Sequence, residues 1–277
     1  MGRRDMLRDI TLGQYYQTES VIHKLDPRVK LAGTLIYVIT IFFYKNFLGY
    51  ALAILFLAFV IRLSHVPFRF MVKGMKAILF LLMVTVLYNL FLTPGTPVFT
   101  LGKLHITKEG TGIAISMALR LSLLVIGSSL LTLTTTPNNL TDGMEKGLRF
   151  LKIFKVPVHE IAMMMSIALR FIPILLEETD KIMKAQMARG ADFESGNLIV
   201  RAKAMVPLLV PLFVSAFRRA SDLAMAMEAR CYRGGEGRTK MKPLKYHGRD
   251  YLAYLLLLFF MVFSIWAGRL KLPMLTI

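Results

Sequence analysis

The sequence is poor in the residues that build most catalytic and covalent sites. It contains one cysteine, Cys231, which excludes an internal disulfide framework and a cysteine-rich metal site. The five histidines are scattered without the spacing of metal ligands. His159-Glu160 begins a zinc-protease pattern, but Met163 stands where the second histidine belongs. We therefore expect neither an enzyme nor a bound metal or cofactor.

A phosphate-binding loop is also missing. A transporter that hydrolyses ATP itself needs the pattern G-x-x-x-x-G-K-[ST]. Gly102-Lys103 is followed by Leu104, and no glycine stands at the required distance upstream. The chain therefore does not carry its own ATPase site.

Acidic residues are scarce: 17 Asp and Glu stand against 35 Lys and Arg, which gives a net charge of +18. In a soluble protein this excess would indicate nucleic-acid binding. However, the basic regions lack interleaved aromatic residues, and the chain is 55% hydrophobic with a mean hydropathy of +0.55. Such a composition is typical of an integral membrane protein. The charge then fits cytoplasmic loops, anionic lipid or an acidic protein partner, and we expect no nucleic-acid partner.

Five apolar runs predict five membrane-spanning helices, since a span needs about 20 mostly apolar residues. The first two are short and form a hairpin around Lys45-Asn46, and a Pro-Gly-rich loop follows the third. The predicted spans are Leu31–Tyr44, Phe47–Ile61, Ala77–Leu92, Gly112–Leu133 and Tyr251–Ala267. The predicted fold class is an all-α integral membrane protein.

The distribution of basic residues predicts a cytoplasmic amino terminus, because Lys and Arg in short loops gather on the cytoplasmic side. With five spans, the basic residues of 1–30, 62–76 and 136–249 fall inside. The loop 94–110 places only Lys103 and Lys108 outside, and the carboxyl terminus ends outside with Arg269 and Lys271.

Two further apolar runs, His159–Leu176 and Ala204–Phe217, leave a seven-span arrangement open, which would be that of a self-sufficient small-solute permease. If this pair crossed, the basic residues between Lys181 and Lys203 would lie outside, against the charge rule. Both runs contain proline and continue into charged sequence. We interpret them as long amphipathic helices at or partly in the membrane interface.

An enzyme of the membrane interface is another alternative. It predicts clustered acidic or histidine residues near the interface, and Glu177, Glu178 and Asp180 are the nearest cluster. Lys181 and Lys184 follow at the spacing of ion pairs on a helix surface. This pattern favours an ordinary charged helix face over a catalytic site.

These patterns divide the chain into three parts. Residues 1–135 hold an N-terminal segment and four spans, 136–249 form a helical cytoplasmic module, and 250–277 hold the last span and the carboxyl terminus. The module has no core of its own, so it must pack on the spans and on a partner. Pro137 and Pro157 mark helix starts, and a short helix is predicted over Leu140–Phe154.

Both long helices of the module end in Ala-Arg followed by a small residue. The two triplets are Ala188-Arg189-Gly190 and Ala229-Arg230-Cys231, separated by 41 residues (189 to 230). Arginine offers five donors in a rigid fork and keeps its charge, while small neighbours allow another protein to approach closely. Gly190 can also end its helix in a left-handed cap. Two such ends predict two acidic pockets on a dimeric partner.

The chain resembles the transmembrane T component, EcfT, of energy-coupling factor transporters, which import vitamins and metal ions in prokaryotes. In that family, triplets with a central arginine, most often Ala-Arg-Gly, end two long cytoplasmic coupling helices. Ala188–Gly190 has this form in full, and Cys231 replaces the glycine of the second triplet. Leu25-Asp26-Pro27-Arg28-Val29-Lys30 resembles the sequence before the family's first span. Asp26 would cap that helix and Pro27 would start it.

The resemblance implies a transport subunit of a prokaryotic plasma membrane. Two ABC-type ATPases, identical or different, would receive the arginine ends in grooves that carry acidic groups. A small membrane-embedded S component would bind the vitamin or other micronutrient and release it inward as the coupling helices move. The transported substrate is selected by that absent S component.

The sequence also offers candidates for contact with the S component. Methionine forms deformable surfaces that suit several partners, and proline can bend a helix around a partner. The candidate residues are Met163, Met164, Met183, Met205, Pro207 and Pro211. Burial in a core or exposure to lipid remains the alternative for the methionines.

Overall fold

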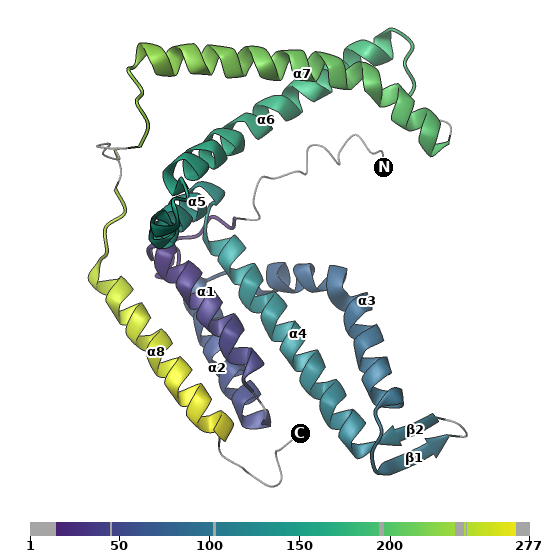
Figure 1. The fold of residues 1–277 in the computed structure, drawn as a ribbon. Helices are drawn as coiled ribbons and strands as arrows, with labels where there is room; N and C mark the ends of the chain where they lie inside the picture. Colours follow the sequence, from purple (N-terminus) through teal and green to yellow (C-terminus); the bar gives the residue numbers. More distant parts are fainter. Residues whose placement is uncertain are drawn as a thin grey trace. The chain divides into compact units, whose positions relative to one another are not determined.

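The computed structural model describes residues 15–44, 46–101, 104–193, 197–235, 241 and 243–269. These ranges do not include the arginines near the amino terminus, Lys103 or Lys271. The side of the membrane predicted for each of these residues therefore lies outside what the structure describes. The regular structure of the described residues is helical apart from one short β-hairpin, which confirms the predicted helical membrane class (Figure 1). It divides into two compact units, which we describe separately.

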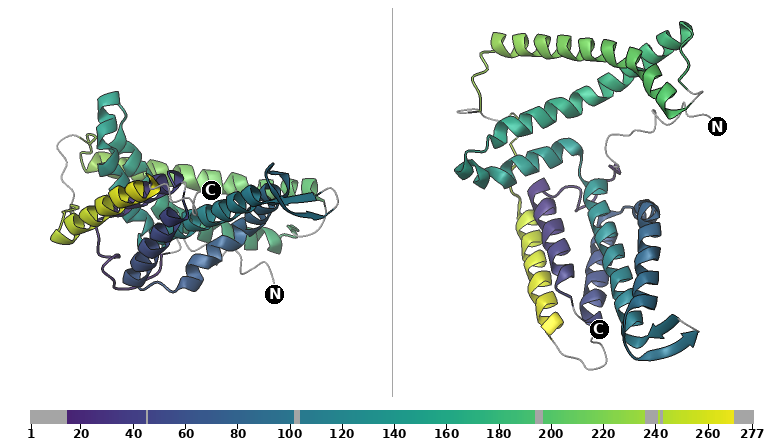
Figure 2. Two further views of the ribbon diagram at one scale, coloured as in Figure 1. Left: turned by 90° about the horizontal axis from the view of Figure 1, so that it is seen from below. Right: turned by 45° about the vertical axis from the view of Figure 1, so that its right-hand side comes forward.

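The larger unit comprises 13–147 and 244–277 and contains the predicted spans. This unit contains α-helices and the two strands of a hairpin. In sequence order, their bounds are α1 Pro27–Phe42, α2 Phe47–Ser64, α3 Phe68–Leu92, β1 Pro97–Leu101, β2 Leu104–Thr107, α4 Lys108–Thr134, α5 Pro137–Gly147 and α8 Gly248–Arg269. Helix α4 packs against α1, α2 and α3, and α8 packs against α1 and α2 (Figure 2).

The core of this unit lies where α1, α2, α4 and α8 meet. Tyr37, Ile41 and Tyr50 are almost fully buried there with Leu123 and Phe260. Many other large apolar side chains of these helices are exposed, such as Leu55 of α2 and Leu255 of α8, each at 67%. A helix that is apolar on its outer surface as well is expected in lipid.

Four helices of the described chain are individually long and apolar enough to cross a membrane: α2, α4, α8 and α6 of the other unit. The two parts of α3, Phe68–Lys76 and Ile78–Leu92, meet at a 66° bend and form a fifth candidate if they count as one span. Helix α1 has 16 residues, or about 24 Å, which is less than the apolar thickness of a bilayer. By length and composition, the described helices therefore give four or five candidate spans. This set omits the predicted first span, which lies in α1, and includes α6, which was interpreted as an interfacial helix.

The predicted loop after the third span contains an antiparallel β-hairpin. Strands β1 and β2 pair from Pro97–Thr107 to Leu101–Leu104, with an irregularity near Pro97. Proline cannot donate a ladder hydrogen bond, which agrees with its place at the end of a strand. The residues Thr93 to Pro97 predicted only a loop here, so the strand pairing was not predicted from the sequence.

The smaller unit includes 148–243 and contains the short 3-10 helix η2 (Leu148–Phe154), α6 (Val158–Ala188) and α7 (Leu198–Ala229). Its boundaries lie inside those expected for the module, because α5 and Leu244–Arg249 belong to the larger unit. The helix predicted over Leu140–Phe154 is two elements, α5 and η2, that meet at Gly147 and Leu148.

Candidate docking site on the helix ends

The two arginine triplets occupy equivalent positions at the ends of α6 and α7. Ala188 and Ala229 are the last helical residues, and Arg189 and Arg230 follow as C-caps with φ of −89° and −92°. Both arginines are exposed. The sequence thus predicted the location of both helix ends to the residue.

The same hydrogen-bond pattern closes both helices. After α6, the amide of Gly190 donates to Met187 O and the amide of Ala191 donates to Gln186 O, both at 3.0 Å. After α7, the Cys231 amide donates to Glu228 O at 2.8 Å and the Tyr232 amide donates to Met227 O at 3.0 Å. Each is a Schellman motif, which satisfies carbonyls that a helix end otherwise leaves open.

The third residue of each triplet has a left-handed backbone. Gly190 has a φ of +89° and Cys231 a φ of +54°. A side chain is disfavoured in this conformation, so glycine is the residue that the cap itself prefers. A Cβ placed on Gly190 would meet no atom within 4 Å, so backbone conformation rather than crowding within this chain favours glycine there.

An ion pair joins α6 to α7 some distance before their ends. Arg219 of α7 donates from its guanidinium to the Glu178 carboxylate, and both side chains are about one-third exposed. The two helices cross one another in Figure 1 and in the right-hand view of Figure 2. Each partner lies eleven residues before its terminal arginine (178 to 189 and 219 to 230), which is about 16 Å along each helix.

Helix α7 carries an exposed apolar face that the sequence did not single out as a whole. We call it the α7 apolar face; its seven members are between 47% and 72% exposed. They are Met205, Val206, Leu209, Val210, Phe213, Val214 and Phe217. A contiguous surface of this kind marks contact with another protein or with lipid.

The predicted S-component residues are distributed unevenly with respect to this face. Met205 belongs to it, and Pro207 is exposed between its members, whereas Pro211 is half-buried. On α6, Met164 is 58% exposed, while Met163 and Met183 are half-buried. Both prolines lie inside the continuous helix α7, which bends in the half nearer its start (Figure 1).

The predicted span Gly112–Leu133 contains a charged residue, Arg120, whose role was not predicted from the sequence. Arg120 lies in α4, where its Nη2 donates to Tyr50 Oη at 2.9 Å and to Tyr44 O at 3.3 Å. The guanidinium also lies 5.9 Å from the centre of the Phe42 ring. These contacts join the end of α1 and the start of α2 to α4, which is a structural use of a charge at membrane depth.

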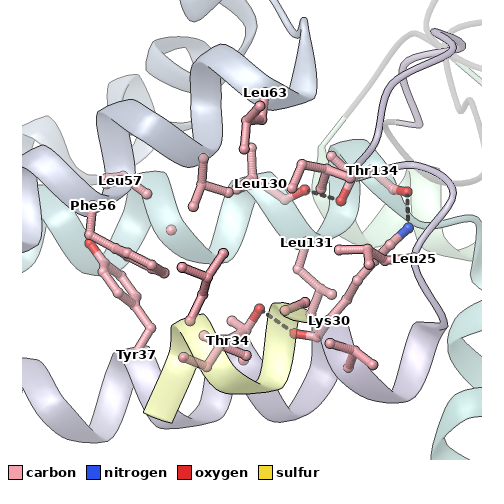
Figure 3. Close-up of a pocket in the computed structure, with 18 of the residues that line it drawn as sticks. Leu25, Lys30, Thr34, Tyr37, Phe56, Leu57, Leu63, Leu130, Leu131 and Thr134 are labelled. Atoms are coloured by element: carbon pink, nitrogen blue, oxygen red, sulfur yellow. Dashed lines mark hydrogen bonds between the residues drawn. The ribbon is translucent and has the colours of Figure 1, made fainter. Parts of the chain in front are cut away.

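A cavity of about 140 Å³ lies between α1, α2, α4 and α8 (Figure 3). Its lining is mainly apolar, and its polar groups already bond within the chain. Lys30 Nζ donates to Thr134 O at 2.9 Å, and Thr34 Oγ1 donates to Lys30 O at 2.9 Å. Such a lining offers little to a polar solute, so the cavity gives the permease alternative no support. Within the described ranges, no group of three or more His, Cys, Asp or Glu could hold a metal ion.

Comparisons with known proteins agree on one family. The sequence profile of the family described as cobalt transport protein (CbiQ) matches residues 18–241. A relative from Clostridium kluyveri is 54% identical over 270 residues, covering 95% of this chain and all of the relative. Relatives from Ruminiclostridium cellulolyticum and Bacillus subtilis are 55% and 51% identical, covering 94% and 88% of this chain and 97% and 93% of their own. All three are named energy-coupling factor transporter transmembrane protein EcfT.

Proposed function

The chain belongs to the CbiQ family, among the energy-coupling factor transmembrane proteins EcfT, and we propose that it couples two ABC-type ATPases to a membrane-embedded S component. It is a multi-pass protein of a bacterial membrane and a non-catalytic subunit of a transporter. The proposed cargo is a vitamin or another micronutrient. The S component would select that cargo, and the amino terminus of this chain would be cytoplasmic.

The matching geometry of the two arginine ends is the observation that carries the proposal. Each end presents an exposed guanidinium beyond a closed helix cap, so the backbone there needs no further partner. A guanidinium pairs in bidentate fashion with a carboxylate, and the pairing strengthens when water is excluded. Two equal ends suit two equal or similar acidic grooves, one on each ATPase subunit.

The Glu178–Arg219 pair gives the two helices a common point of contact. Because both ends lie about 16 Å beyond that pair, a separation of the ATPase subunits would act on α6 and α7 through arms of equal length. The α7 apolar face begins at Met205 and runs toward the pair. We assign the S component to this face because the helix that carries it also carries one of the two docking ends.

Affinity purification from the native cells in mild detergent tests the docking. Wild type is compared with Arg189→Glu/Arg230→Glu, and Arg218→Glu serves as the control because Arg218 is exposed on α7 but lies away from its end. We expect the ATPases to accompany wild type and the control, and to be lost from the double variant. Wild type recovered without ATPases, or ATPases retained after both charge reversals, would overturn the proposal.

A further inference from the structure

The segment Leu25–Lys30 has a role in the structure beyond starting α1. Asp26 caps the helix, as predicted, by accepting from the Arg28 amide at 2.9 Å. Its carboxylate also lies 3.3 Å from Arg28 Nε. The Asp26 amide in turn donates to Asp250 Oδ1 at 2.9 Å, although the two residues are 224 positions apart. The start of the first span is therefore bonded directly to the start of the last.

Asp250 is positioned to make this connection. It is 1% exposed, and its second oxygen accepts from the His247 amide at 2.7 Å. This bond closes the first turn of α8 in the manner of a capping box. One buried carboxylate thus satisfies an amide on each side of the junction between α1 and α8.

Two cations meet at a single carbonyl oxygen close by. Arg28 Nη2 donates to Leu244 O at 3.0 Å, and Lys146 Nζ of α5 donates to the same oxygen at 3.1 Å. The Arg28 guanidinium also lies 4.4 Å from the centre of the Tyr246 ring. Gly143 brings α5 against Pro27, where an added Cβ would lie 2.9 Å from the proline Cβ.

These residues stand where the chain leaves the larger unit and returns to it. The chain leaves after Gly147, one residue beyond Lys146, and returns at Leu244. Arg28, Lys146 and Leu244 all belong to the larger unit, so the contacts among them do not depend on the placement of the smaller one. The outgoing and returning segments are therefore fastened to each other and to the first turn of α1.

We propose that Arg28 and Lys146 are positioning residues that hold both connections of the smaller unit at one point of the larger unit. We call this arrangement the clamp. The clamp comprises Asp26, Arg28, Lys146, Leu244 and Asp250. The role of the clamp rests on the proposed coupling function. A subunit that transmits motion through α6 and α7 needs these helices attached to the larger unit at a defined point. Without the clamp, the two connections could move independently of each other. Motion of α6 and α7 would then displace the connecting segments and would not be transmitted to the larger unit.

The test uses Arg28→Met/Lys146→Met, which removes both donors and keeps most of the side-chain volume. Lys24→Met is the matched control, because Lys24 is an adjacent cation that pairs with Glu19 at the surface. Spin labels at Met144 and Lys245, both exposed in the larger unit, report whether the two connections stay together. The labelled proteins carry Cys231→Ser so that only the introduced cysteines react, and they serve only for the distance measurement. Substrate imported per ATP hydrolysed and ATPase recovery are measured on unlabelled complexes that keep Cys231.

Wild type and the control should give one narrow distance distribution, and the double variant a broad one. Import per ATP in the double variant should fall at least about tenfold, because the variant loses two hydrogen bonds from charged groups and each corresponds to about tenfold or more. ATPase recovery should be unchanged, and Arg28→Lys should restore part of the coupling. An unchanged distance distribution would overturn the clamp, and an altered distribution with unchanged import per ATP would overturn its positioning role. If wild type lacks ATPase partners, the proposed function fails, and the distance measurement still decides whether the clamp exists.

Discussion

Arg219 and Glu178 join the two long helices at positions that lie equally far from the arginines that end them. The hydrogen bond between these side chains connects α7 to α6 across 41 residues of sequence. The relation is a property of the smaller unit alone. It makes the pair the natural place to test whether α6 and α7 act together.

Reversing either charge of this pair should impair coupling. We expect Glu178→Arg and Arg219→Glu each to reduce uptake in reconstituted vesicles strongly, because each places like charges at the helix contact. The double variant Glu178→Arg/Arg219→Glu should recover much of the uptake. Arg218→Glu, one residue away and exposed, is the control. Uptake that is unaffected by the single reversals would contradict a role for the pair.

The left-handed residue at the end of α7 should respond to substitution by glycine. Cys231→Gly should stabilise the cap by about 1 kcal/mol, since a side chain is strained at positive φ. Amide exchange at Tyr232, which bonds to Met227 O, should then slow about fivefold. Gly190→Ala should have the opposite effect on the Ala191 amide. Equal exchange in wild type and both variants would show that neither backbone is strained.

Close packing between α1 and α4 should make Gly127 intolerant of a side chain. A Cβ at this position would overlap the Tyr37 ring, so we expect Gly127→Ala to destabilise the protein by about 1–3 kcal/mol. Gly147→Ala is the matched control, because its Cβ would meet nothing within 4 Å. Thermal unfolding in detergent measures both. A melting temperature that falls for Gly147→Ala but not for Gly127→Ala would contradict the packing.

Arg120 should be important for the stability of the larger unit. Arg120→Met leaves the Tyr44 carbonyl and the Tyr50 hydroxyl without this donor, which we expect to cost about 1–3 kcal/mol. Tyr50→Phe removes one of the two contacts and should cost less. The unfolding midpoint in detergent gives the order of the two variants. The reverse order would show that Arg120 does not hold the α1–α2 turn.

The segment before α1 should loosen in acid. The neutral His23 ring donates from Nε2 to Tyr16 O at 3.0 Å and accepts from the Ser20 hydroxyl at 2.7 Å. Burial lowers the pKa of His23, and the positive charge of Lys30 lowers it further. The folded state therefore binds a proton less readily than the unfolded state, and its stability falls as the pH drops below about 6.5.

Amide exchange at Tyr16, whose amide donates to Leu133 O, measures this loss. It should accelerate between pH 6.5 and 5 beyond its intrinsic pH dependence in wild type and show no such added change in His23→Asn. The same pH dependence in both proteins would assign the effect to another group.

Some features could be predicted from the sequence because they depend on local chemistry. Apolar runs predicted the membrane class, since the interior of a bilayer requires backbone groups to bond within each helix. Asp26-Pro27 predicted the start of α1, and the two Ala-Arg triplets predicted the ends of α6 and α7. A helix cap involves residues within one or two turns of each other, so its signal is contained in a short stretch of sequence.

Other features were decided by tertiary structure because they join residues far apart in the chain. Nothing around Glu178 or Arg219 indicates that they pair, and nothing around Arg28 or Lys146 points to the carbonyl of Leu244. A carbonyl is carried by every residue, so sequence cannot show which one receives a cation. Arg120 likewise gained its partners only when the α1–α2 turn packed against α4. The sequence determined which helices form and how they end, whereas packing determined which charges meet.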